Sequence, residues 1–281
     1  MIIKTDGTRI GSLPIRNTAV LITPKTKICL LVYASPKIGK TTLCATLDTM
    51  TKKFFGKPTL IIACETADGG GTMSIQEFGV DFVQPTNRDE LLSVIAALGS
   101  DTTYGGVAVD SFSEVARSLI QPYALNFPAR VGEPRRAAGV PEISDYHTMG
   151  EDARKMLNQL VALTVHPNLN IRKHLIVTAL SKTKYDKGGN TIIRVCPDLP
   201  GQMADTATAV FQTVGTIQVK VKVIKEEERI RQVKERYLVT EGDGVVILGD
   251  RTKCFPDEGT LDMVKIWEEG FVPRIAKVAM A

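Results

Sequence analysis

One stretch near the N-terminus, Ala34-Ser35-Pro36-Lys37-Ile38-Gly39-Lys40-Thr41-Thr42, has the residue types and spacing of a phosphate-binding loop. It fits the pattern G-x-x-x-x-G-K-[ST], with alanine in place of the first glycine. In such a loop, backbone N–H groups and the N-terminus of the next helix hold phosphate oxygens. Gly39 lets the backbone approach the phosphate, Lys40 supplies a catalytic charge between the β- and γ-phosphates, and Thr41 ligates Mg²⁺. We therefore expect ATP and Mg²⁺ as ligands.

The loop must lie between a strand and a helix, and the flanking sequence agrees. Residues 28–33 form an apolar run typical of a central parallel strand, and apolar residues at 43, 47 and 50 indicate a helix. Without this context, the alternative would be a strand–turn–helix that carries the tail GKTT by chance. Further strands are predicted at 59–64, 106–109 and 174–180, and helices at 89–98, 112–125 and 144–165. This alternation predicts an α/β fold with a mainly parallel sheet flanked by helices.

The pattern changes beyond residue 190. Residues 191–195, 213–223 and 232–239 are predicted to be strands without intervening helices, followed by a short helix at 261–267. We expect strands and turns in 1–26, a nucleotide-binding core in 27–212 and a β-rich C-terminal extension of the same domain in 213–281. Residues 126–143, rich in Pro, Gly, Ala and Arg, are expected to form an inserted loop.

Two acidic residues stand at the ends of predicted strands. Asp110 follows the run 106–109 and is expected to hold Mg²⁺ with the loop threonine, assisted by Ser111; the alternative is a helix-capping aspartate. Glu65 follows the run 59–64. Because ligands bind at the carboxyl ends of parallel strands, Glu65 is expected to face the γ-phosphate and activate the attacking water. Glu114 is the competing candidate for this base, and a plain surface acid is the alternative for Glu65.

Composition limits the class of protein. The 281 residues are 43% hydrophobic and 23% charged, which argues against a disordered chain or a small disulfide scaffold. The net charge, 35 − 31 = +4, permits nucleic-acid binding without demanding it. The five cysteines have no zinc or redox spacing, so we expect buried, reduced thiols in a cytoplasmic protein. The apolar runs are far shorter than the ~20 residues that span a bilayer, so no membrane partner is expected.

The order of phosphate loop, strand ending in Glu65, and VAVDS at 107–111 resembles RecA-fold ATPases. Two later stretches, PDLPGQ at 197–202 and GDRT at 249–252, resemble segments of phage-encoded AAA-type nucleotide-binding proteins, which include the RecA-like single-strand annealing proteins of the Sak type. The resemblance covers roughly residues 25–260. It implies a RecA-like P-loop NTPase fold, ATP-dependent binding of single-stranded DNA in annealing or recombination, cooperation with a single-strand-binding protein, and a location in the host-cell cytoplasm.

The same resemblance implies a homo-oligomer, a ring or filament, with nucleotide between protomers and a basic finger from the neighbour. Arg251 and Lys253 are the candidates, and a surface ion pair with Asp250 or Asp257 is the alternative. The family commonly carries a polar sensor, often histidine, after the fourth strand. Here the run is 178–182, where Ser181 or Lys182 would have to substitute, so slow turnover is expected.

A basic segment follows the fourth predicted strand. Residues 172–194 hold six cations against one acid, Asp186, and Gly188-Gly189 suggests a flexible loop over 181–190. Cations neutralise phosphates and an aromatic ring can stack on a base, whereas a solvated hairpin turn is the alternative. Arg130, Arg135 and Arg136 form a second, weaker group. The candidate DNA-binding residues in the segment are Lys182, Lys184, Tyr185, Lys187 and Arg194.

Two other functions remain open. One is an AAA-type ATPase that remodels a protein or DNA partner without annealing, which a dispensable basic loop would favour. The other is an assembly module that binds ATP without turnover. The three histidines are not spaced as a metal site and are expected to be structural, and Trp267 is expected to anchor the last helix in the core.

Overall fold

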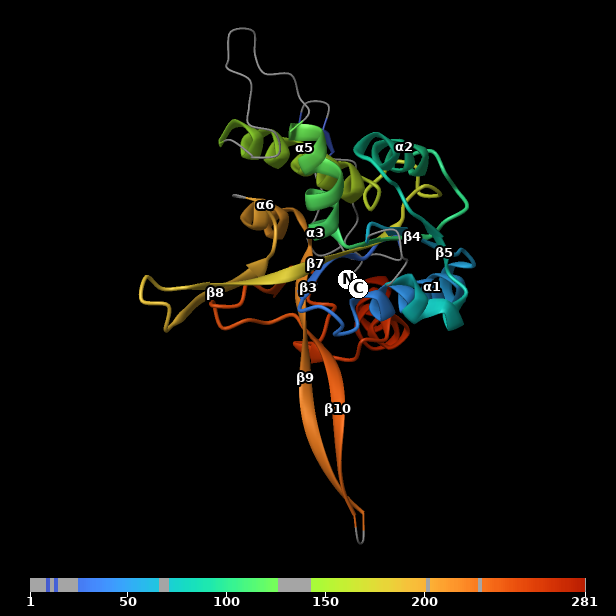
Figure 1. Ribbon diagram of the computed structural model, residues 1–281. Coiled ribbons are helices and arrows are strands. Elements are labelled where there is room, and N and C mark those ends of the chain that lie inside the picture. The colour runs from blue at the N-terminus through green and yellow to red at the C-terminus, as the bar shows by residue number, and fades with distance from the viewer. Residues whose placement is uncertain are drawn as a thin grey trace.

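The computed structural model describes residues 9–10, 13–14, 25–65, 71–125, 143–200, 203–226 and 229–280. Its centre is a sheet with the strand order β12-β10-β9-β3-β7-β6-β4-β5, parallel from β5 to β9 and antiparallel beyond β9 (Figure 1). The strands are β3 (Cys29–Ala34), β4 (Thr59–Ala63), β5 (Asp81–Val83), β6 (Gly106–Asp110), β7 (His174–Tyr185), β9 (Thr213–Glu226), β10 (Arg229–Val239) and β12 (Glu258–Gly259).

Helices cover both faces of this sheet. Because side chains alternate along a strand, Cys29, Leu31 and Tyr33 of β3 pack into one core, and Leu30, Val32 and Ala34 pack into the other. The first core is closed by α2 (Arg88–Leu98), α3 (Phe112–Glu114), η3 (Val115–Ile120), α4 (Gln121–Leu125), α5 (Ile143–Ala162) and α6 (Met203–Val210). The second is closed by α1 (Lys40–Phe55), η2 (Thr72–Phe78), α7 (Met263–Ile266) and η4 (Trp267–Phe271), and α8 (Val272–Met280) follows. The predicted α/β architecture is confirmed.

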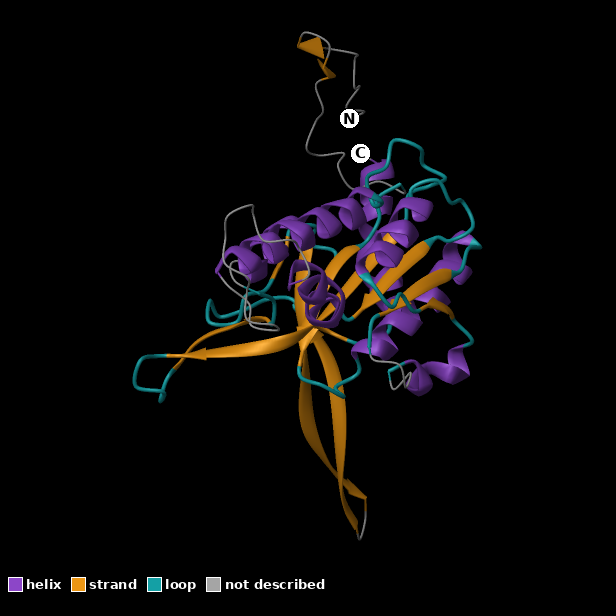
Figure 2. Ribbon diagram, turned by 45° about the horizontal axis from the view of Figure 1, so that its top comes forward, coloured by secondary structure: helices purple, strands orange, loops and turns teal. Residues whose placement is uncertain are grey.

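Strand β3 is flanked by two longer strands. Ala34, at its end, pairs with Leu180 of β7, but β7 continues to Tyr185; Tyr33 pairs with Thr216 of β9, but β9 continues to Glu226. Each long strand then turns back, β7 into β8 (Ile192–Pro197) and β9 into β10. Figures 1 and 2 show the two hairpins leaving the body in different directions. The segment after β3 therefore emerges between the bases of two hairpins.

Two sequence expectations are wrong here. Residues 181–185 are strand rather than loop, because antiparallel pairing with β8 satisfies their backbone, and only the turn from Asp186 to Thr191 remains. The strands after residue 190 are also interrupted by a helix, α6, which buries Met203, Ala204 and Ala207. This helix was not predicted because its eight residues are mostly alanines and threonines, with few large apolar side chains to show a helical pattern. Strand β9, where the expected extension begins, pairs in parallel with β3.

Several smaller expectations are met. All five cysteines are free and buried. Trp267 packs against Phe55 and Phe271, and His174 is buried beside it. Separately, β1 (Arg9–Ile10) and β2 (Leu13–Pro14) form an antiparallel pair, while the expected inserted loop lies almost wholly outside the described residues. Within the described segments, no helix has both the length and the apolar content needed to cross a bilayer.

Candidate nucleotide-binding site

The predicted phosphate loop connects β3 to α1. Gly39 has φ 111°, a left-handed conformation that favours glycine, and a Cβ there would lie 3.3 Å from Leu261 Cδ1 and 3.4 Å from Arg236 Cδ. Ala34 instead is a strand residue with its side chain in the core, and its φ is not positive. This explains why alanine is accepted in place of the first glycine of the pattern.

The start of α1 suits an anion. Its first turn carries no acidic residue, and no side chain caps it, so the first N–H groups are open to a ligand. A cavity of about 510 Å³ lies over these groups. It is lined by Pro36, Lys37, Gly39, Lys40, Thr41, Thr42, Glu65, Gly71, Ser74, Leu180 and Arg236. The loop, the helix end and the cavity therefore fit a nucleotide phosphate chain.

Asp110 is buried at the end of β6 and lines a smaller hollow that shares Glu65 and Gly71 with this cavity. Its Oδ2 accepts a hydrogen bond from Thr41 Oγ1 at 2.6 Å, and its Oδ1 accepts one from Thr178 Oγ1 at 2.5 Å. The N-cap of α3 is Ser111 rather than Asp110, so the carboxylate is directed to the phosphate loop and not to the helix. Mg²⁺ in such sites takes one or two protein oxygens together with phosphate and water, and the Thr41–Asp110 pair fits that requirement.

Lys40 is nearly buried and points back over its own loop. Its Nζ donates to the carbonyls of Ala34 at 3.1 Å and Ser35 at 2.8 Å. Burial lowers the pKa of Lys40, while the nearby carboxylates of Asp110 and Glu65 oppose that shift. The lysine therefore lies within the field of both acids at the floor of the cavity.

Glu65 lines the cavity, as expected for a group facing the γ-phosphate. Burial raises its pKa, the charges of Asp110 and Glu114 raise it further, and Lys40 opposes the rise. A carboxylate with a raised pKa is a better proton acceptor than an exposed one. The competing Glu114 does not line the cavity; its carboxylate accepts from Arg117 at 3.3 Å on its own helix. The geometry favours Glu65 over Glu114.

Three residues near this site were missed by the sequence analysis. A Cβ on Gly71 would lie 2.5 Å from Glu65 Oε2, so glycine makes room for the carboxylate. Gln84 Nε2 donates to the Glu65 carbonyl at 3.0 Å. Arg236 reaches the cavity from β10. The glycine run at 69–71 was a usable signal, but nothing local marks Gln84 or Arg236.

The candidate finger residues lie elsewhere. The backbone N–H of Arg251 bonds to Gln212, next to Thr213, which pairs with Leu30 near the start of β3. Arg251 therefore lies near the amino ends of the parallel strands, whereas the phosphate loop lies at their carboxyl ends. Lys253 lines a separate cavity of about 480 Å³. Among the described residues, neither cation forms an ion pair with Asp250 or Asp257.

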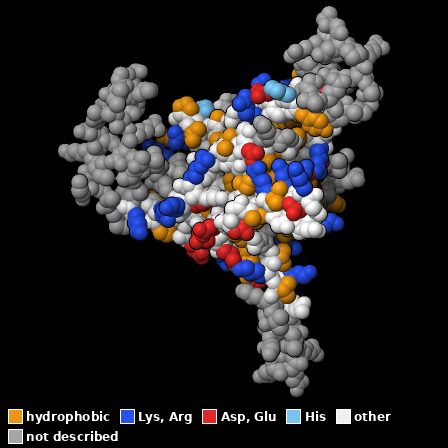
Figure 3. Space-filling model, turned by 90° about the vertical axis from the view of Figure 1, so that its left-hand side faces the viewer, with side chains coloured by type: hydrophobic (Ala, Val, Ile, Leu, Met, Phe, Trp, Pro, Cys, Tyr) orange, Lys and Arg blue, Asp and Glu red, His pale blue; other side chains and the backbone are white. Residues whose placement is uncertain are grey.

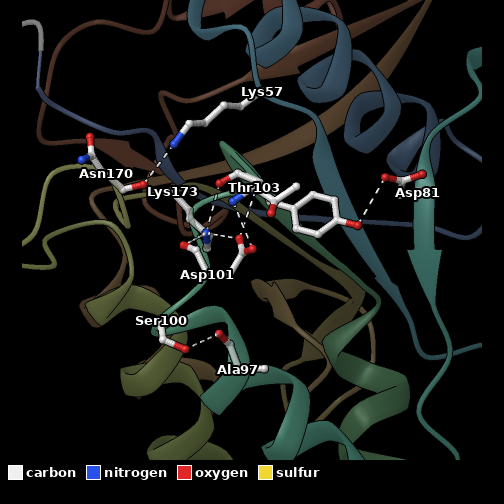
Figure 4. A network of polar contacts seen from close by, with 9 residues as sticks. Lys57, Asp81, Ala97, Ser100, Asp101, Thr103, Asn170 and Lys173 are labelled. Carbon is white, nitrogen blue, oxygen red and sulfur yellow. Dashed lines mark hydrogen bonds and ion pairs between the residues drawn. The ribbon is translucent and has the colours of Figure 1, made fainter.

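The six cations of segment 172–194 do not form one surface. Their charges therefore cannot be added together as one DNA-binding site, as the sequence suggested. Lys173 is fully buried, and its Nζ donates to Asp101 Oδ2 at 2.8 Å and to the carbonyls of Asp101 and Tyr104, both at 3.0 Å (Figure 4). Because Lys173 immediately precedes β7, it lies at the amino ends of the parallel strands, away from the hairpin that extends β7 at its other end. It cannot contact DNA together with the residues of the hairpin.

On the β7–β8 hairpin, the candidates differ in how they are paired. Lys182 lies 3.9 Å from Asp198, and Arg194 bonds to Asp205. Lys184, Tyr185 and Lys187 are exposed. Figure 3 views the side on which this hairpin projects and shows Lys and Arg side chains spread over that face, with acidic side chains gathered below them. Arg130, Arg135 and Arg136 lie outside the described residues.

Comparison with known proteins agrees with this geometry. The family model for the AAA domain matches residues 26–252. No match was found among curated proteins. The crystal structure of a KaiC-like protein from the hyperthermophilic archaeon Pyrococcus horikoshii OT3 aligns over 79% of this chain and 88% of its own, with 14% identity and a TM-score of 0.40. The family match covers most of the chain and agrees with a parallel sheet, a phosphate loop and a strand-end aspartate. The chain therefore belongs to the AAA domain family, and its α/β fold carries the phosphate loop of a P-loop nucleotide-binding domain.

Proposed function

We propose that the protein is a Mg²⁺-dependent ATPase that acts on single-stranded DNA, in annealing or recombination. The observation that carries the DNA part is the continuity of β7. One strand contains Thr178, which donates to Asp110, and Tyr185, which is exposed on the projecting hairpin. A change at the nucleotide site can therefore be transmitted to the hairpin through a single strand.

The roles at the site follow from the contacts. The loop N–H groups and Lys40 bind and orient the phosphates, and Thr41 and Asp110 would hold the metal. Mg²⁺, when bound, neutralises charge developing on the β- and γ-phosphates. Glu65 accepts a proton from the attacking water, and its raised pKa suits it to that task. Thr178 fixes the second oxygen of Asp110 and so orients the metal-facing oxygen.

DNA binding is assigned to the tip of the β7–β8 hairpin. Lys184 and Lys187 are exposed and form no ion pair within the described part of the chain, so they are available to phosphates. Tyr185, 54% exposed between them, is available to stack on a base. Lys182 and Arg194, which have acidic partners, are assigned a smaller share.

The test is ATP hydrolysis with and without single-stranded DNA, for the intact protein and for Lys40→Ala. We expect DNA-stimulated turnover that falls on the order of 10³-fold in the variant, because preorganised charge is lost where the phosphates react. The double variant Lys184→Ala/Lys187→Ala should weaken binding of a fluorescent oligo(dT) and reduce its log–log salt slope by about 1.4, or about 0.7 per lost contact.

The matched control is Lys155→Ala/Lys265→Ala, which removes two exposed lysines from α5 and α7. The DNA assignment is wrong if the hairpin and control variants bind oligo(dT) equally well. Turnover that ignores DNA would favour a protein-directed ATPase, and nucleotide binding without turnover would favour an assembly module.

A further inference from the structure

Arg236 approaches the phosphate loop from a strand of the same chain. It lies on β10 opposite Val219 of β9, beyond the point where β3 ends. A Cβ built on Gly39 would be 3.4 Å from Arg236 Cδ and 3.8 Å from its Nη1, so the side chain lies against the loop backbone. It forms one wall of the cavity that also contains Lys40 and Glu65.

The guanidinium of Arg236 has no partner in the part of the chain that the structure describes. Within the described residues, Arg236 makes no hydrogen bond or ion pair, although Glu65 faces the same cavity. Lys220, on the same hairpin, by contrast pairs with Glu258. Guanidinium groups bind phosphate with short, charge-assisted and often bidentate hydrogen bonds. An unpaired arginine against an open phosphate loop is thus matched to an anionic ligand.

The base of the hairpin holds this arginine in place. Leu238 and its partner Ile217, the next pair on the same face towards the body, are buried in the core that also contains α1. Leu238 also pairs with Gly259 of β12, and Leu261, soon after β12, is the other side chain against Gly39. Arg236 is therefore positioned by the same core as the loop that it approaches.

We propose that Arg236 is a phosphate ligand acting in cis, which binds the nucleotide held by its own protomer's loop on the Gly39 side. This proposal rests on the proposed nucleotide function and adds a binding residue to it. Because the contact is with the loop itself, it should serve ADP as well as ATP. It differs from a finger contributed by a neighbouring protomer, for which Arg251 and Lys253 were the sequence candidates.

The binding test uses methylanthraniloyl-labelled ADP and a non-hydrolysable ATP analogue, titrated into intact protein, Arg236→Ala, Arg236→Lys and Lys234→Ala. Lys234 is the matched control: it is an exposed cation on the same face of β10, one residue pair further out, and does not line the cavity. We expect Arg236→Ala to weaken both ligands about ten- to a hundredfold, the range for a lost charged hydrogen bond. Arg236→Lys should restore part of this, and Lys234→Ala should bind as the intact protein does.

A mixing test separates cis from trans action. In an equal mixture of Arg236→Ala and Lys40→Ala proteins, a residue acting in trans would complete some sites and restore turnover. A residue acting in cis completes none, and we expect no restoration.

The proposal is overturned if Arg236→Ala binds ADP within threefold of Lys234→Ala, or if the mixture regains activity. Failure of the intact protein to bind either nucleotide would instead refute the nucleotide function. Matching circular dichroism and thermal unfolding of the variants would show that the substitutions left the fold intact.

Discussion

The two sides of β3 differ in how their charged and polar groups are partnered. On the β7 side lie the acids, Asp110 and Glu65, and Asp110 is held by Thr41 and Thr178. On the β9 side lies Arg236, a cation without a protein partner among the described residues. The strand order alone produces this division, since β6 and β4 follow β7 on one side of β3, and β10 follows β9 on the other.

This difference suggests a division of labour. Groups that are already hydrogen-bonded are preorganised, which matters most for the chemical step. An unpaired cation gains its partner only when an anion arrives, so it matters most for binding. We therefore expect substitutions on the β7 side to lower kcat, and substitutions on the β9 side to lower nucleotide affinity.

Of the substitutions that test this division, Glu65→Gln should have the largest effect. Loss of the general base should lower kcat by about 10²–10⁴-fold while leaving ADP affinity nearly unchanged. In the intact protein, kcat should fall as pH decreases through the pKa of Glu65. Because burial raises that pKa, the fall should begin at a higher pH than for an exposed glutamate.

The measurement is steady-state hydrolysis across pH, with Glu114→Gln as the control on the neighbouring helix. An equal loss in both variants, or a Glu65→Gln enzyme with normal turnover, would remove Glu65 from the chemical step.

A smaller effect is expected from Thr178→Val, a substitution of similar volume. It removes the hydroxyl that donates to Asp110 Oδ1, so the carboxylate loses one of its two fixed contacts. We expect kcat to fall roughly tenfold, as for one charged hydrogen bond, with a higher Mg²⁺ requirement. Magnesium titrations of turnover would measure this. If Thr178→Val instead changed only ADP affinity, the division between the two sides of β3 would be broken.

The smallest effect is expected away from both sides of β3, in the Asp101–Lys173 network at the amino ends of the parallel strands. Burial raises the pKa of Asp101, but Lys173 and the N–H groups of Tyr104 and Thr103 outweigh it and hold the pKa at about 2. Because this pKa is lower in the folded than in the unfolded chain, the ionised carboxylate stabilises the fold at pH values above the ordinary aspartate pKa. The contribution is lost as pH falls towards 2. Since water screens the partly exposed carboxylate, we expect about 1 kcal/mol.

The measurement is urea unfolding at pH 5 and pH 2.5. At pH 5, Asp101→Asn should have a smaller free energy of unfolding than the intact protein. At pH 2.5, the difference between the two free energies should be smaller. Asp257→Asn, at an exposed aspartate, is the control, and turnover should be unaffected in both variants. A difference in free energy of unfolding that did not depend on pH would show that the charge of the Asp101 carboxylate does not stabilise the fold.

Much of the β7 side could be predicted from local patterns. The apolar runs that become β3, β4 and β6 are each followed by a candidate site residue or by the phosphate loop, so rules about strand ends led to the predictions for Asp110 and Glu65. The hairpin extension of β7 could not be predicted in this way. Residues 181–185 alternate hydroxyl-bearing side chains with lysines and contain no aliphatic residue, so their strand conformation depends on pairing with β8.

The sequence predicts the phosphate loop, the buried strands and the free, buried cysteines, because these depend on short-range features: glycine conformation, N–H spacing and apolar content. The sequence does not predict that Lys173 is buried against Asp101 or that Arg236 reaches Gly39; these contacts form only in the folded chain. Both contacts join residues far apart in the chain, and both depend on strand order and register. Those are set by packing of the whole sheet, which no local pattern encodes.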